Sequence, residues 1–181
     1  MSRAVLSIGS NIGDRMAHLQ SVCDGLADVV VATSAVYSTA PWGGVEQQDF
    51  LNAVVVVDDP NREAADWLAA GQELEQQAQR VREEHWGPRT LDVDVISVRS
   101  AGRDVVSDDP VLTLPHPRTS QRAFVLIPWL DVDPAAILWH DGEQVRVADL
   151  IAALPDDERS GVHRTDGQLV VAGRGAGTGI G

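Results

Sequence analysis

The sequence predicts an α+β fold: an antiparallel sheet with its helices packed on one face, followed by a C-terminal extension. Short runs rich in β-branched and apolar residues alternate with longer segments whose apolar residues recur at helical spacing. Glycine, proline and aspartate cluster between these segments, as turns require. The 181 residues are 44% hydrophobic and 23% charged, which is typical of one globular domain with a buried core.

Six elements in the order βαββαβ are expected in the first part of the chain. They cover, in order, residues 4–8, 16–26, 29–37, 50–57, 60–79 and 90–98. This order is the ferredoxin-like arrangement, in which two helices pack on one face of an antiparallel sheet.

The first strand is mainly apolar and ends at the turn Gly9-Ser10-Asn11. The first helix follows from apolar residues at spacings of three and four, namely Met16, Leu19, Val22 and Leu26. Cys23 lies on the same stripe, so we expect its side chain to be buried and unreactive.

The second half of the pattern begins with a β-branched run over residues 29–37, and the next strand covers residues 50–57. Asp58-Asp59-Pro60 then predicts a helix start, because an acidic cap precedes a proline at the first helical position. The expected apolar face of that helix consists of Ala64, Leu68, Gly71, Leu74 and Ala78.

The C-terminal extension begins after the strand over residues 90–98. Residues 99–122 read as loop and short strand, and short helices are expected over 124–130 and 147–154. We expect a single domain over residues 1–172. The glycine-rich tail over residues 173–181 is expected to be disordered.

The composition excludes several classes of function. There is no lysine, which excludes a lysine-dependent P-loop, a protein-kinase lysine and Schiff-base chemistry. Cys23 is the only cysteine, which excludes an internal disulfide and a thiolate metal cluster. The net charge of −13 disfavours binding to nucleic acid or to an anionic membrane. No apolar run approaches the roughly 18 residues of a membrane helix, and no signal segment is recognisable, so we expect a cytoplasmic protein.

The charge is unevenly distributed along the chain. Residues 80–122 carry seven arginines and seven carboxylates, so the rest of the chain carries the whole net charge of −13. An arginine-rich, neutral segment in an acidic protein indicates a local anion site. The alternative is a chance cluster of surface ion pairs.

The run Leu91-Asp92-Val93-Asp94-Val95 alternates strictly between apolar and acidic residues. In a strand, the two aspartates therefore share one face and lie about 7 Å apart. Carboxylates at that separation can each hold one oxygen-preferring cation, or share two cations spaced about 4 Å apart. Together with the neighbouring arginines, the pair is suited to polyphosphate transfer. A solvated strand face and a sugar-nucleotide transferase remain open as alternatives.

Two further segments are candidates for the site. Trp86-Gly87-Pro88-Arg89 reads either as an ordinary turn or as a mobile loop that delivers Arg89 to a transition state. Phe50 and Asn52 point to the same face of a strand, where the ring can stack on a flat heterocycle and the amide can read its donors and acceptors. The alternative is that Phe50 is a core residue and Asn52 bonds the edge of the ladder.

Taken together, these segments resemble the 6-hydroxymethyl-7,8-dihydropterin pyrophosphokinase family of the folate pathway. The resemblance covers about residues 4–135 in the family's order, and the run from Trp86 to Asp94 is its most specific part. The matching stretches are 6–11, 37–39 onward to 50–52, 80–82, 86–94, 115–118 and 122–126.

The resemblance implies that the terminal pyrophosphoryl unit of ATP is transferred to the pterin's hydroxymethyl oxygen, with release of AMP. It implies that Asp92 and Asp94 hold two Mg²⁺ ions, and that Arg80 and Arg89 are catalytic residues that neutralise charge at the β-phosphorus. The residues that it implies for the ATP site are Gln72, Arg82, Trp86, Val95, Leu112, His116 and Arg122.

For the pterin pocket, the resemblance implies a ring stacked between Phe50 and Phe124. The complete set that it implies is Thr39, Trp42, Phe50, Asn52 and Phe124. ATP and the pterin are the expected partners of a monomeric protein.

The sequence departs from the family's habits at a few positions. Ala40 stands where a second proline is frequent, Trp42 where a leucine is frequent, and Gln79 where a glycine is common. These changes concern the shape and motion of loops, and they leave the acidic pair and the arginines in place.

Two classes of function compete with the pyrophosphokinase. A non-catalytic ligand-binding module is one, because ferredoxin-like domains often serve as regulatory or RNA-binding units. A nucleotidyl transferase is the other, and it would release pyrophosphate in place of AMP.

Overall fold

The computed structural model describes residues 1–40, 48–83 and 90–172, with the backbone alone for residues 80–83. Its first part follows the order expected from the sequence. The elements are β1 (Ser2–Ser10), α1 (Arg15–Gly25), β2 (Val30–Thr33), β3 (Tyr37–Thr39), β4 (Phe50–Asp59), α2 (Ala64–Glu83) and β5 (Asp92–Ser100).

The remaining described residues form shorter elements. Most of them belong to the C-terminal extension. They are β6 (Arg103–Asp104), β7 (Ser107–Asp109), β8 (Leu112–Leu114), the 3-10 turn η1 (Thr119–Gln121), α3 (Ala123–Val132), β9 (Ile137–His140), β10 (Glu143–Arg146), α4 (Val147–Ala153), α5 (Asp156–Ser160) and β11 (Val162–Arg164).

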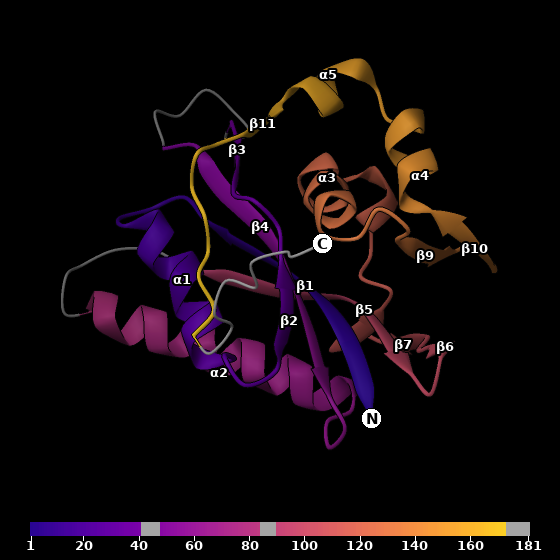
Figure 1. Ribbon diagram of the computed structural model, residues 1–181, viewed down its shortest axis with the longest axis horizontal. Helices are drawn as coiled ribbons and strands as arrows, with labels where there is room; N and C mark the ends of the chain where they lie inside the picture. The colour runs from indigo at the N-terminus through magenta and orange to yellow at the C-terminus, as the bar shows by residue number, and fades with distance from the viewer. Residues whose placement is uncertain (41–47, 84–89, 173–181) are drawn as a thin grey trace, which may run out of the picture.

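The main sheet has the strand order β11-β3-β4-β1-β5-β6, and β2 also pairs with β4. Its central strand β1 is antiparallel to both neighbours, β4 and β5. Figure 1 shows α1 and α2 on one side of these strands and α3, α4 and α5 on the other. The antiparallel sheet that the sequence predicts is therefore present, in a mixed α and β structure.

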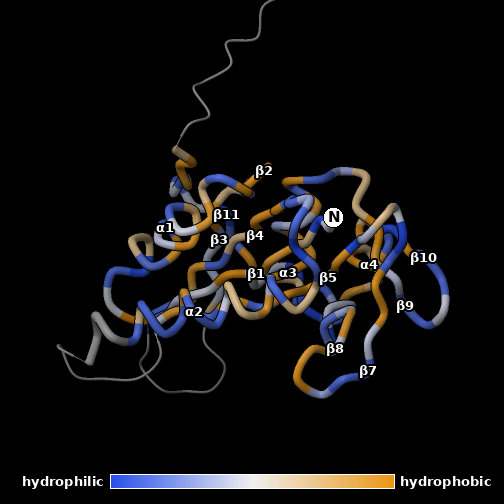
Figure 2. The backbone as a smooth tube through the Cα atoms, turned by 90° about the horizontal axis from the view of Figure 1, so that it is seen from below, coloured by the Kyte–Doolittle hydropathy of each residue, from blue (hydrophilic) through white to orange (hydrophobic). Residues whose placement is uncertain are grey.

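The first face of the sheet is covered by α1 and α2. Leu19, Val22 and Cys23 of α1 are buried there together with Trp67 and Leu74 of α2. The Trp67 indole N–H donates to Ser2 Oγ over 2.8 Å, which satisfies a buried polar group at the start of β1. The expected apolar stripe on α2 omitted Trp67 and included Leu68, which is only partly buried. Figure 2 shows hydrophobic residues along β1 and β4.

The start of α2 differs from the prediction. The helix begins at Ala64, whereas the sequence placed its start near Pro60. The reason is a turn at the end of β4: Asp59 Oδ1 accepts from the Asn61 N–H over 2.7 Å. The first helical turn is then capped by Asp66 Oδ2, which accepts from the Glu63 N–H over 2.7 Å.

The expected long strand over residues 29–37 is divided into β2 and β3. At the break, Ser34 Oγ accepts from the Val54 N–H over 2.9 Å, so a side chain takes the place of a backbone carbonyl in the ladder. Asp131 Oδ2 of α3 accepts from the next N–H, that of Ala35, over 2.9 Å. The interruption is therefore bonded to the layer above the sheet.

The second face of the sheet is covered by α3 and α4 of the C-terminal extension, for which the sequence predicted no particular face. Val5, Val54, Val56 and Ile96 point to this face and pack against a strongly apolar helix, α3. An apolar strand face of this size has to be covered, and the extension provides the layer. The short helices expected over 124–130 and 147–154 correspond to α3 and α4.

The end of the described chain returns to the first part of the fold. β11 pairs antiparallel with β3, with Val162 opposite Thr39. Further on, Gln20 of α1 exchanges two hydrogen bonds with the backbone of Val170. None of the described helices combines the length and the apolar character of a membrane span. The tail over residues 173–181, expected to be disordered, lies outside the described residues.

Candidate active site

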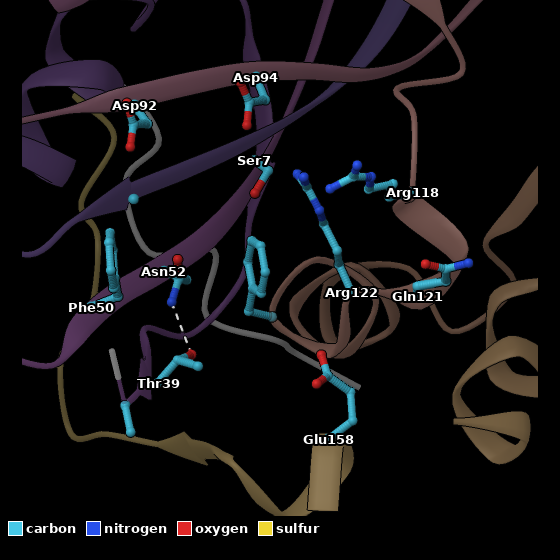
Figure 3. A pocket seen from close by; sticks show the side chains of 13 residues that line it. Ser7, Thr39, Phe50, Asn52, Asp92, Asp94, Arg118, Gln121, Arg122 and Glu158 are labelled. Carbon is cyan, nitrogen blue, oxygen red and sulfur yellow. Dashed lines mark hydrogen bonds between the residues drawn. The ribbon is translucent and has the colours of Figure 1, made fainter. Parts of the chain in front are cut away.

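A cavity of about 620 Å³ opens on the second face of the sheet. It lies where α3 begins, beyond the apolar contact between α3 and the strands (Figure 3). The residues that line it are Ser7, Gly9, Thr39, Ala40, Phe50, Asn52, Asp92, Asp94, Arg118, Gln121, Arg122, Phe124 and Glu158.

Asp92 and Asp94 lie on β5 and both point into the cavity (Figure 3). Between them Val93 is buried on the opposite face, in the core against α1 and α2. Asp94 is opposite Ser7 of β1 in the ladder, and Asp92 is opposite Gly9. The alternation in the sequence thus places two carboxylates side by side at the cavity wall.

Gly9 of β1 lies between the acidic pair on β5 and Asn52 on β4. In the ladder it faces Asp92 on one side and Asn52 on the other. A Cβ atom on Gly9 would lie 3.0 Å from Asn52 Oδ1, which is closer than ordinary contact. A residue without a side chain therefore leaves the cavity floor open between the amide and the carboxylates.

Phe50, Asn52 and Thr39 form the opposite side of the cavity. Thr39 of β3 is paired with Phe50 of β4. Asn52 is 4% exposed, and its Nδ2 donates to Thr39 Oγ1 over 3.0 Å (Figure 3). This bond holds the amide in one plane at the bottom of the cavity, where buried polar groups need partners.

Arg122 and Phe124 enter the cavity from the start of α3. The Arg122 guanidinium carbon lies 5.7 Å from the centre of the Phe124 ring. Arg118 has a left-handed backbone with φ of 65°, and its side chain also lines the cavity. The described cavity wall therefore combines two guanidinium groups with three carboxylates, those of Asp92, Asp94 and Glu158.

His116 reaches the edge of the same site. Its backbone N–H donates to the Ile96 carbonyl over 2.8 Å, which ties the segment to β5. Its Nε2 lies 3.9 Å from Asp94 Oδ1, and its Nδ1 lies 3.0 Å from the Pro117 carbonyl oxygen. The ring is thus held beside the acidic pair without being part of the cavity wall.

Comparison with known proteins identifies the family. The model of the 7,8-dihydro-6-hydroxymethylpterin-pyrophosphokinase (HPPK) family matches residues 5–134. The chain belongs to the HPPK family. It is similar to the 2-amino-4-hydroxy-6-hydroxymethyldihydropteridine pyrophosphokinase of Mycobacterium leprae, at 53% identity over 172 residues that cover 92% of this chain and 90% of the relative. The enzyme of the same name from Mycobacterium tuberculosis is 51% identical over 167 residues, 90% of this chain and 89% of the relative.

The solved structures that resemble the chain include HPPK-DHPS proteins. One is a Plasmodium falciparum HPPK-DHPS variant with pterin and p-hydroxybenzoate, with a TM-score of 0.62 at 14% identity. The match covers 90% of this chain and 47% of that longer one. At this identity the likeness concerns the fold.

The cavity brings together residues from three of the sets that the HPPK resemblance implied. Within the described residues, these are Thr39, Phe50, Asn52 and Phe124 of the pterin set and Arg122 of the ATP set, next to Asp92 and Asp94. One cavity therefore holds both the acidic pair and the aromatic and amide groups.

Besides His116 at its edge, three described residues of the predicted ATP set do not line this cavity. Val95 is buried on the first face of the sheet, and Leu112 of β8 packs against the same core. Gln72 is exposed on α2. Five further predicted residues lie outside the part of the chain whose side chains are described: Trp42, Arg80, Arg82, Trp86 and Arg89.

Sequence reasoning named no role for six of the residues that line the cavity: Ser7, Gly9, Ala40, Arg118, Gln121 and Glu158. Ser7, Gly9 and Arg118 lie inside the matching stretches, so the ladder partners of the aspartates and the arginine beside His116 were open to inference. Glu158 comes from the extension, and no local pattern around it pointed to a cavity.

Proposed function

We propose that this cavity is where the HPPK family member transfers the terminal pyrophosphoryl group of ATP to the hydroxymethyl oxygen of 6-hydroxymethyl-7,8-dihydropterin. The observation that carries the proposal is the placement of Asp92 and Asp94 in the same cavity as Phe50, Asn52 and Phe124. The residues suited to bind phosphate and the residues suited to bind a heterocycle then line the same cavity. A transfer between two substrates requires that both substrates are bound next to each other.

The acidic pair fits Mg²⁺ by the chemistry of its donors. Mg²⁺ prefers hard oxygen ligands and binds through one or two carboxylates, with water and phosphate oxygens completing its shell. The two side chains offer only oxygen donors, whereas zinc sites are usually built from cysteine and histidine ligands. We assign Asp92 and Asp94 as the residues that would hold two Mg²⁺ ions, and the positive charge of such ions would offset the charge of the triphosphate.

The pterin half is assigned to the β3–β4 side and to α3. A flat pterin suits a slot between the rings of Phe50 and Phe124, since stacked aromatic groups attract each other. The Asn52 amide, fixed by Thr39, presents a carbonyl oxygen to ring N–H donors. Trp42 remains a prediction for this pocket.

The arginines are assigned to the phosphate groups. Arg122 lies in the cavity between the pterin half and the acidic pair, where its planar guanidinium can bind phosphate oxygens bidentately. Arg118, beside it, is assigned the same role. For Arg80 and Arg89 as catalytic residues, and for the ATP roles of Gln72, Arg82, Trp86, Val95, Leu112 and His116, the resemblance remains the basis.

The reaction balances without a covalent enzyme intermediate. The pterin's hydroxymethyl oxygen forms a bond to the β-phosphorus while the bond from the β-phosphorus to the α,β-bridging oxygen breaks. AMP leaves with that oxygen, and the hydroxyl proton is released. Positioning and charge neutralisation supply most of the acceleration in such transfers.

Three broader assignments belong to the same proposal. We infer ferredoxin-like connectivity, supported by the order of β2 and β3, β4, β1 and β5 across the sheet. We infer one domain over residues 1–172, supported by the pairing of β11 with β3. We still expect a cytoplasmic monomer. Light scattering of the purified protein measures its molar mass and so tests whether it is a monomer.

Product analysis tests the function. The protein is incubated with ATP, Mg²⁺ and the reduced hydroxymethylpterin, and the nucleotides are separated by chromatography. We expect AMP in equal amount to the pterin diphosphate, and no AMP when the pterin is omitted. Release of pyrophosphate would instead identify a nucleotidyl transferase, and absence of turnover with retained pterin binding would identify a binding module.

A further inference from the structure

We propose that Glu158, in the C-terminal extension, is a positioning residue for the pterin half of the site. It lies outside residues 5–134, which the family model matches, and its carboxylate lines the cavity (Figure 3). The proposal rests on the assignment of Phe124 to the pterin, and it adds a contact that holds Phe124 in place.

The contact is made with the first turn of α3. Glu158 Oε1 accepts a hydrogen bond from the Ala123 N–H over 3.2 Å. The first N–H groups of a helix have no partner within the helix, and the N-cap residue Arg122 makes no side-chain capping bond. A carboxylate from α5 therefore caps α3 from outside, where its charge also complements the helix dipole.

The capped residue lies between two residues of the site. Ala123 is fully buried, and its neighbours Arg122 and Phe124 both line the cavity. A shift of the Ala123 backbone moves both neighbours. The long Arg122 side chain can readjust through its rotatable bonds, whereas the short Phe124 side chain has two torsions and follows the backbone. Glu158 therefore controls the ring more strongly than the guanidinium.

The segment that follows Glu158 also contacts the β3 side of the cavity, opposite α3. Four residues after Glu158, Val162 of β11 pairs with Thr39 of β3, and Thr39 is the partner of Asn52. The segment from Glu158 to Val162 is thus joined to both sides of the pterin half. A displacement of about 1 Å between reacting groups can reduce the rate by about a hundredfold, so a brace of this kind bears on the reaction.

The test compares three variants of the full chain. Glu158→Ala removes both the charge and the acceptor, Glu158→Gln retains an acceptor oxygen, and Asp157→Ala removes a neighbouring exposed charge that does not line the cavity. KM for the pterin and for ATP, kcat and the melting temperature are measured for each, and pterin binding is titrated separately.

For Glu158→Ala we expect the pterin KM and Kd to rise about tenfold, which corresponds to about 1.4 kcal/mol, with a change of less than about twofold in the ATP KM. Glu158→Gln should restore most of the pterin affinity, and Asp157→Ala should match the wild type. Equal losses in Glu158→Ala and Glu158→Gln would overturn the positioning role, because the charge itself would then be what the substrate senses. Wild-type behaviour of Glu158→Ala would overturn it as well.

The two proposals fail in different ways. If the wild type forms no AMP, the proposed function fails whatever the variants do. If the wild type forms AMP and binds the pterin, but Glu158→Ala retains wild-type pterin Kd and KM, only the role of Glu158 fails.

Discussion

The two faces of the central sheet use the same strands, but they are closed to different extents. On the first face, α1 and α2 cover the strands, and Leu91, Val93 and Val95 of the β5 region are at most 5% exposed. On the second face, α3 and α4 cover Val5, Val54, Val56 and Ile96 and then stop. Beyond them the strands present polar residues to the cavity.

This difference shows how alternating side chains of one strand can serve both the hydrophobic core and the cavity. Side chains that point to the first face contribute burial, and their neighbours at the open end of the second face contribute charge. The position at which α3 begins decides where burial ends and the cavity starts. Substitutions on opposite faces of β5 should therefore affect different measurable quantities.

The largest effect is expected for the acidic pair. Asp92→Ala and Asp94→Ala should each reduce kcat by about a hundredfold to a thousandfold, the loss typical when one electrostatic group is removed from a transition state. Their melting temperatures should stay near the wild-type value, because both side chains are partly exposed at a cavity. Steady-state kinetics with Mg²⁺ and thermal denaturation check the two statements.

Val93→Ala is the matched control on the other face. It removes two buried methyl groups, so the free energy of unfolding should fall by about 2 kcal/mol, while kcat stays within about twofold. If Val93→Ala abolished turnover in the folded state, or if both aspartate variants retained near-normal activity, the division between the faces would be wrong.

Smaller effects on kinetics and stability are expected at two glycines, Gly9 and Gly71. Gly9 lies close to a side chain on the second face of the sheet, and Gly71 lies close to a side chain on the first face. An added Cβ would meet Asn52 Oδ1 at 3.0 Å from Gly9, and Val93 Cγ1 at 3.0 Å from Gly71. Gly9→Ala should displace the Asn52 amide and raise the pterin KM about tenfold, or about 1.4 kcal/mol. Gly71→Ala should leave KM unchanged, and its packing strain is offset by about 1 kcal/mol of helix propensity.

The outcome for this pair is read from kinetics and urea denaturation together. A pterin KM that is unchanged in Gly9→Ala would mean that the Asn52 amide has no part in binding. An altered pterin KM in Gly71→Ala would show that strain on the first face reaches the cavity through β5.

Local patterns in the sequence were sufficient for much of the fold. The alternation over residues 91–95 correctly put the apolar residues and the aspartates on opposite faces of the strand, because a strand repeats every two residues, and the structure shows Val93 and Val95 in the core. The helical stripe that includes Cys23 was also correct. Such signals depend on near neighbours in the chain, which is why they can be read without coordinates.

The errors arose where distant residues decide the structure. Pro60 in a turn and Ala64 at the helix start depend on which side chains cap the helix, and both Asp59 and Asp66 were available. The full burial of Trp67 depends on a partner 65 positions earlier in the chain, Ser2 at the start of β1. The contact between Glu158 and Ala123 joins residues 35 positions apart, and no local periodicity encodes it.

The smallest effect is expected at Cys23, which reports how completely the first face is closed. Burial raises the pKa of the Cys23 thiol from about 9 to about 11, with a further contribution from Asp24. As the pH rises, the Cys23 thiol ionises in the unfolded chain before it ionises in the folded protein, and this favours unfolding. The contribution of the un-ionised thiol to the free energy of unfolding is therefore complete below about pH 9 and is lost as the pH rises toward about 11. At about pH 9.5 the loss amounts to about 0.8 kcal/mol.

Urea denaturation measures this loss when the wild type and Cys23→Ala are compared at about pH 8 and about pH 9.5 in the presence of reductant. Both proteins share the titration of Tyr37, whose pKa is also raised by burial and by Asp131, so the difference between them belongs to Cys23. An identical pH dependence in the two proteins would mean that water reaches the thiol and that the first face is less closed than the contacts of α1 and α2 indicate.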